Sequence, residues 1–195
     1  MNQEQIINVA RELKGSPLIL SDSGRKIGQV SDAIVHPTEG SLLGLVATNL
    51  GVERLLLAED FHLFSATGAV IMPEDTHLNL DKINGALRDG VCVCRDLIGA
   101  EAITNSGKLL GRVIEVYVMK EELRTIYRVA SSRLQRMFGG GFFVAGNLPH
   151  AWSKIGARLI FNAEVNRPGP FASLDEAAYF VQRGKRRLAF AGDKR

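Results

Sequence analysis

The sequence predicts an all-β protein: two small β-barrels in tandem, with short flanking helices. The first observation is a repeated pattern, SGRKIGQVSD at residues 23–32 and SGKLLGRVIE at residues 106–115, with an offset of 83 (107 − 24). The second is a later match, HLFSATGA at 62–69 and HAWSKIGA at 150–157, with an offset of 88 (150 − 62). The third is a series of short β-prone runs separated by turn residues, which is typical of small barrels. Two ordered matches indicate a duplicated domain.

The first copy follows a short N-terminal helix, which we expect because Ile6, Val9, Ala10 and Leu13 recur at helical spacing before Gly15. Serine, aspartate and glycine at 21–24 predict a turn, and Gly24 accepts a positive φ there. The strands predicted for this copy cover residues 17–20, 27–35, 42–48, 55–57 and 69–72.

The second copy repeats this order after a linker with a short helix predicted near residues 80–87. Its strands are predicted at 101–104, 113–118, 123–130, 142–145 and 157–161. Ser173 and Glu176 then form a capping-box pattern, so we expect a helix to about Gln182 that Gly184 ends. The predicted organisation is a helix and first barrel at 1–73, a linker at 74–93, a second barrel at 94–162, and a helix with a basic tail at 163–195.

Composition places the chain among ordinary globular proteins, because 46% of its residues are hydrophobic and 23% are charged. Cys92 and Cys94 alternate along a predicted strand, so we expect two buried, reduced thiols that share neither a metal nor a disulfide. No segment approaches the ~20 apolar residues of a membrane span. These features predict a cytoplasmic protein.

Several of these motifs together resemble the PRC-barrel domain. The resemblance rests on LKGSPL at 13–18, the SGxxIGxVxD run, HPTEG at 36–40, LAED at 57–60 and GAVI at 68–71, and it returns from LIGA at 97–100 onward. The family is typified by the cytoplasmic domain of the photosynthetic reaction-centre H subunit and by the C-terminal domain of a ribosome maturation factor. The resemblance implies docking or assembly modules without a catalytic residue set. It carries over neither specific role, because this chain lacks the H subunit's membrane helix and the maturation factor's N-terminal domain.

The residues that could bind a ligand or catalyse a reaction do not assemble into a predicted active site. The glycines at 24, 28, 107 and 111 join strands and are followed by no helix, so we interpret them as serving backbone geometry and not phosphate binding. His62 and His150 occupy matching repeat positions, but zinc usually takes three or four ligands. We therefore interpret both as structural histidines at a strand entrance, and we expect no catalytic residues, no cofactor and no metal.

An insertion in the second copy is the predicted docking site. Residues 131–141 replace the shorter stretch 49–52 of the first copy, and such an excursion tends to be exposed. Protein interfaces are enriched in apolar and arginine side chains. In the alternative, the apolar side chains fold back over the seam between the barrels. The predicted docking residues are Arg133, Leu134, Arg136, Met137 and Phe138.

These observations predict a non-catalytic adaptor or assembly factor that docks onto a protein in a larger complex. The alternative is an RNA- or ribosome-associated factor, which would use phosphate contacts or a ribosomal protein. In that alternative the phosphate contacts come from the arginines of the insertion and from the basic tail, whose candidates are Arg183, Lys185, Arg186 and Arg187.

Overall fold

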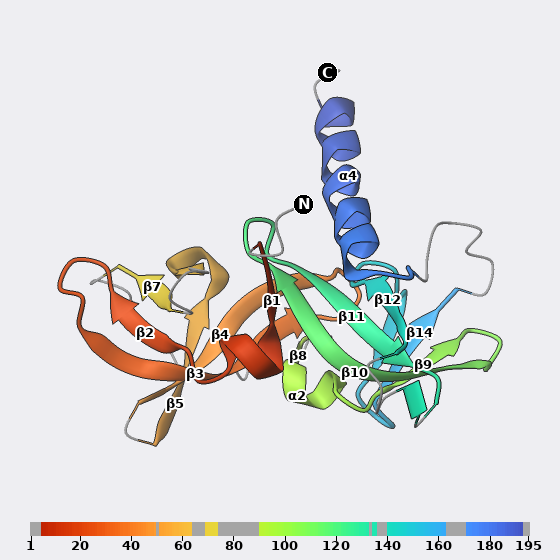
Figure 1. The fold of residues 1–195 in the computed structure, drawn as a ribbon, viewed down its shortest axis with the longest axis horizontal. Helices are drawn as coiled ribbons and strands as arrows, with labels where there is room; N and C mark the ends of the chain where they lie inside the picture. The colour runs from red at the N-terminus through yellow and green to blue at the C-terminus, as the bar shows by residue number, and fades with distance from the viewer. Residues whose placement is uncertain are drawn as a thin grey trace.

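The computed structural model describes residues 5–49, 51–63, 69–73, 90–132, 134–135, 140–162 and 171–192, with residues 184–192 described by their backbone alone. Within this part of the chain, fourteen strands form one sheet, and the protein is mostly β (Figure 1). The all-β prediction is therefore confirmed. The first half contains β2 (Pro17–Leu20), β3 (Lys26–His36), β4 (Ser41–Asn49), β5 (Val52–Leu57), η3 (Ala58–Asp60), β6 (His62–Leu63) and β7 (Val70–Met72). The second half contains β9 (Glu101–Thr104), β10 (Leu109–Met119), β11 (Arg124–Ala130), β12 (Phe142–Ala145), β13 (Ala151–Ser153) and β14 (Arg158–Phe161).

The two halves repeat the same strand pairing. The order β6-β7-β2-β3-β4-β5 in the first half corresponds to β13-β14-β9-β10-β11-β12 in the second. Gly28 pairs with Leu18, and Gly111 pairs with Ala102, so the two glycines occupy the same register position. A Cβ at Gly28 would lie 2.8 Å from the carbonyl oxygen of Thr48, which explains why this close strand approach needs glycine.

Closed barrels are not confirmed. In the described residues no ladder joins β5 to β6 or β12 to β13, so the edge strands of each half stay unjoined, although Phe143 of β12 forms an isolated antiparallel bridge with Phe171. The strands at two of these edges are short, because β6 has two residues and β13 has three. One register pair, Arg124 with Ser41, joins β11 to β4 and makes the halves parts of a single sheet.

Each half is preceded by a short lead segment that pairs with the other half. The first lead is β1 (Ile6–Asn8) with the π-helical turn η2 (Val9–Leu13), and β1 pairs with β10 of the second half. The second lead is β8 (Cys92–Val93) with the helical turn α2 (Cys94–Leu97), and β8 pairs with β3 of the first half. The leads are thus exchanged between the halves, and the main hydrophobic core includes residues of both halves and both leads.

The predicted N-terminal helix is wrong over its first turn. Residues 6–8 form a strand, because they find a ladder partner in β10. The helical turn begins only after Asn8, whose side-chain oxygen accepts hydrogen bonds from the backbone N–H groups of Ala10 and Arg11. This is ordinary N-cap chemistry, and the helical turn starts at Val9, three residues later than the apolar spacing predicts.

The C-terminal helix α4 (Leu174–Gly192) stands off the second half in Figure 1. The predicted capping box is confirmed, because Ser173 Oγ accepts a hydrogen bond from the Glu176 N–H and the Glu176 carboxylate accepts one from the Ala172 N–H. The predicted stop at Gly184 is wrong. A glycine inside a helix costs about 1 kcal/mol relative to alanine, and the strong helix formers around it offset that cost. Among the described helices, none is both long enough and apolar enough to span a membrane.

Candidate functional site

The predicted docking segment is described in part. Leu134 is 66% exposed, so its side chain does not fold back over the seam between the halves. A local turn holds it in place, since the Ser131 N–H and Oγ both donate to Gln135 Oε1, and Ser132 Oγ accepts from the Gln135 N–H. Arg133, Arg136, Met137 and Phe138 lie outside the described residues.

A charged row crosses the sheet beside this segment. Arg158, Glu101, Arg112 and Ala130 are successive register partners on β14, β9, β10 and β11. Arg112 Nη2 lies 2.8 Å from one Glu101 carboxylate oxygen, and Arg158 Nε lies 3.2 Å from the other. The carboxylate therefore holds both guanidinium groups in one line.

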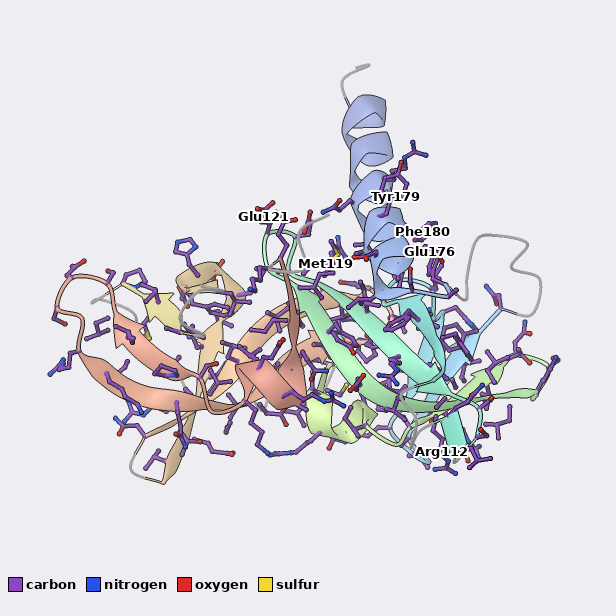
Figure 2. All side chains as sticks on the ribbon, in the orientation of Figure 1. Arg112, Met119, Glu121, Glu176, Tyr179 and Phe180 are labelled. Atoms are coloured by element: carbon purple, nitrogen blue, oxygen red, sulfur yellow. The ribbon has the colours of Figure 1, made fainter. Side chains whose placement is uncertain are left out.

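Exposed apolar side chains lie at both ends of this row. The chain that leaves Ala130 carries Leu134, and the turn that enters Arg158 carries Ile155, which is 92% exposed. We call Leu134, Ile155 and the three ion-paired residues the end surface. Arg112 lies at the rim of the second half, on the side away from α4 (Figure 2).

The first half has no such row. Gln29 occupies the register position of Arg112, and its partners on the two neighbouring strands are Pro17 and Thr48. Strand pairing is the same in both halves, so the sheet does not require the charges. Sequence reasoning missed the row, although comparing the two copies position by position would have shown an arginine where the first copy has a glutamine.

Of the predicted phosphate contacts, Arg183 is described. Its guanidinium carbon lies 4.8 Å from the centroid of the Tyr179 ring, a cation–π arrangement on an exposed face of α4. The side chains of Lys185, Arg186 and Arg187 lie outside the described residues.

Two buried carboxylates bind the exchanged leads to the halves. Asp32 on β3 faces Arg95 of the second lead, and Glu115 on β10 faces Arg11 of the first lead. Each carboxylate follows the same β-bulge in its long strand. The ion pairs thus repeat the reciprocal exchange of the leads.

The environments of these two carboxylates differ. Burial raises the pKa of Asp32 above its ordinary value of 3.8, and the N–H groups of Ala33 and Arg95 offset only part of this effect. Glu115 has three short partners, because Arg11, Arg128 and the Tyr117 hydroxyl each lie 2.6 Å from one of its oxygens.

The predicted equivalence of the two histidines is wrong by one residue. In the first half His62 pairs with Ile71 on β7. In the second half the residue that corresponds to Ile71 is Ile160 on β14, and it pairs with Ala151. His150 therefore lies one residue before the position that matches His62. Both histidines are exposed at a strand entrance, and their structural role stays a prediction. The part of the chain that the structure describes holds no group of three or more His, Cys, Asp or Glu side chains placed to bind a metal.

Both cysteines are free and buried. Cys92 lies in β8 as predicted, but Cys94 begins the helical turn α2 and does not belong to the strand. Burial raises the pKa of Cys92 to about 12 and that of Cys94 well above its ordinary value.

The fold and the end surface define the class: an all-β protein whose second half carries an exposed apolar and ion-paired surface. Comparison with protein families gives a single match, in which residues 8–71 fit the family model of the PRC-barrel domain. The second half lies outside that match. No curated protein matches the chain.

Proposed function

We propose that the second half is a divergent second PRC barrel, and that the protein is a cytoplasmic, non-catalytic adaptor or assembly factor. The repeated strand order and the matching bulges support the first part of the proposal. The end surface supports the second part, and it is the observation on which the proposed function rests.

The end surface has the composition of a protein interface. Leu134 and Ile155 offer exposed apolar area at the two ends of the charged row. They flank a cluster in which Arg112 and Arg158 share the single Glu101 carboxylate, so a partner that covers it meets one net positive charge, which an acidic side chain can match. We propose that the segment at 131–141 and this row together dock a protein of a larger complex.

Paired arginines favour a protein partner over RNA. Glu101 places a negative charge between Arg112 and Arg158, and this charge weakens the attraction of both guanidinium groups for phosphate. The RNA- or ribosome-associated role is therefore the alternative that the experiment must distinguish.

The test is affinity capture from native lysate with wild type and with a Leu134→Ser/Ile155→Ser double variant. The matched control is Leu109→Ser, because Leu109 is also an exposed apolar residue of the second half but pairs with Ile103, toward the opposite end of β9 from Glu101. We expect the double variant to lose the captured proteins, since truncating an interface anchor typically costs about 2 kcal/mol or more. The control should retain them.

Two results contradict the adaptor role. Unchanged capture by a folded double variant excludes the end surface as the docking site. Loss of wild-type capture on RNase treatment, with a log affinity that falls linearly with log salt at a slope of about −0.7 to −0.9 per phosphate, replaces the adaptor with the RNA alternative.

A further inference from the structure

A cavity of about 260 Å³ lies in the seam between the two halves. Both exchanged leads line it at matching positions, with Val9 beginning η2 and Cys94 beginning α2. Asp32 from β3 and Val116 from β10 complete its walls from the two long strands. Ligand sites commonly lie between such units, where residues of separate elements converge.

The buried acceptor in this cavity is the Asp32 carboxylate, whose side chain is 8% exposed. Its Oδ1 accepts a 2.8 Å hydrogen bond from the Ala33 N–H. Its Oδ2 has only long contacts among the described residues, 3.4 Å to the Arg95 N–H and 3.7 Å to the Arg95 Nε. Charge-assisted N–H···O bonds are ordinarily about 2.7–2.9 Å long, so Oδ2 lacks a short donor.

In the second half, the protein itself supplies short hydrogen-bond donors to the corresponding carboxylate. Glu115 receives short bonds from Arg128, its cross-strand partner's side chain, and from Tyr117 two residues onward. At the corresponding positions Asp32 has Val46 across the strand and Ile34 two residues onward. Neither aliphatic side chain can donate a hydrogen bond.

Cations lie at the exposed part of the same cavity. Lys14 and Arg95 both line it and both lower the pKa of Asp32 through their charge, although burial outweighs them. The Arg95 side chain is 62% exposed, in contrast to the buried Asp32. The cavity thus combines an inner acceptor, an apolar wall that includes Ile98, and an outer pair of positive charges.

We propose that the seam cavity binds a small organic anion that carries hydroxyl or ammonium groups. A hydroxyl or ammonium group would donate to Asp32 Oδ2, and the carboxylate or phosphate of the same molecule would meet Lys14 and Arg95. At about 30 Å³ for each water-sized group, the volume suits a ligand on the order of ten non-hydrogen atoms. This inference is independent of the docking role, because none of the end-surface residues is needed for it.

The test titrates the isotopically labelled full-length protein with glycerol 3-phosphate and with L-serine, and follows the amide signals of Ala33 and Arg95 by NMR. Inorganic phosphate supplies the anion without an alcohol hydroxyl, and glycerol supplies alcohol hydroxyls without the anion. We expect saturable shifts with at least one of the two full probes, and about tenfold or more weaker binding of each partial probe.

The variants separate the two ends of the ligand. Asp32→Asn and Lys14→Met should each weaken binding about tenfold or more, whereas Lys108→Met, an exposed lysine in a distant turn, should leave it unchanged. If Asp32→Asn does not fold, Lys14→Met decides alone. The proposal is overturned if neither full probe saturates by about 10 mM, if phosphate alone binds as well, which indicates an adventitious ion only, or if the folded variants bind like wild type.

Discussion

Glu115→Gln tests the buried ion pair between β10 and β11, which Arg11 of the first lead also contacts. The Glu115 side chain is 8% exposed and that of Arg128 is 11% exposed, so this pair at 2.6 Å is effectively buried. Removing one member of a buried pair costs about 3–5 kcal/mol, because the other charge stays desolvated. Arg11 is 74% exposed, so losing its ion pair adds at most about 1 kcal/mol.

The expected cost lies at the lower end of this range. Arg128 keeps one partner, since its Nη2 also donates to the Gly140 carbonyl oxygen at 3.1 Å, and the glutamine oxygen can still accept a hydrogen bond. We therefore expect Glu115→Gln to lower the free energy of unfolding by about 3 kcal/mol, which corresponds to about 6–12 °C in Tm for a chain of this size. Urea denaturation monitored by circular dichroism measures it.

Asp32→Asn is the matched control in the first half. Because burial raises the pKa of Asp32, the folded state binds this proton more tightly than the unfolded chain does. The ionised carboxylate therefore costs stability, and the cost develops as pH rises from 3.8 through the raised pKa. We expect the asparagine variant to stay within about 1 kcal/mol of wild type at pH 7, and to gain relative to wild type as pH rises above the ordinary pKa of 3.8. Equal losses from both substitutions would refute the argument that Glu115 alone holds a buried cation.

Two further substitution or modification experiments test the strand approach and the buried thiols. A Cβ at Gly111, where φ is +153°, would lie 2.5 Å from the Ala130 carbonyl oxygen, so Gly111→Ala adds a clash to backbone strain and should cost about 3 kcal/mol or more by chemical denaturation. Gly107→Ala, with φ +84° and open space, has backbone strain alone and should cost about 1–2 kcal/mol. Equal losses would show that backbone angle and not strand approach decides. Cys92, with a pKa raised to about 12, and the fully buried Cys94 should resist a thiol-disulfide reagent at pH 8 until urea unfolds the chain, and labelling of the native protein within minutes would contradict their burial.

The repeat in the sequence predicts the strand pairing well where the turns are short. The offset of 83 (111 − 28) aligns Gly28 with Gly111, and the two glycines do occupy matching positions in the sheet, opposite Leu18 and Ala102. The match between residues 62–69 and 150–157 is displaced by one residue in the structure. Sequence identity carries no information about strand register, and a single inserted residue shifts every following side chain to the other face of the sheet. His62 and His150 therefore look equivalent in the sequence but do not share a position in the sheet.

The end surface could not be predicted from the sequence for a different reason. Glu101, Arg112 and Arg158 come from three strands, and only the order β14-β9-β10 brings them into one row. From the sequence alone, these three residues are expected to be unrelated surface charges. The exposure of Leu134 could be anticipated from the insertion, but nothing in the sequence pattern marks Ile155 as the other end of the same surface.

The exchange of the leads explains why the two halves can differ without losing their pairing. Each long strand, β3 or β10, receives a ladder from the other half's lead, so the halves depend on one another for backbone hydrogen bonds and for a common core. Positions that maintain this arrangement match between halves, as Gly28 and Gly111 do. Two positions differ between the halves although strand pairing does not require it. Arg112 stands where the first half has Gln29. Glu115 has three short partners, whereas the corresponding Asp32 faces a cavity. Such departures are where binding is to be sought: an outer surface carried by the second half alone, and an inner cavity that neither half can form alone.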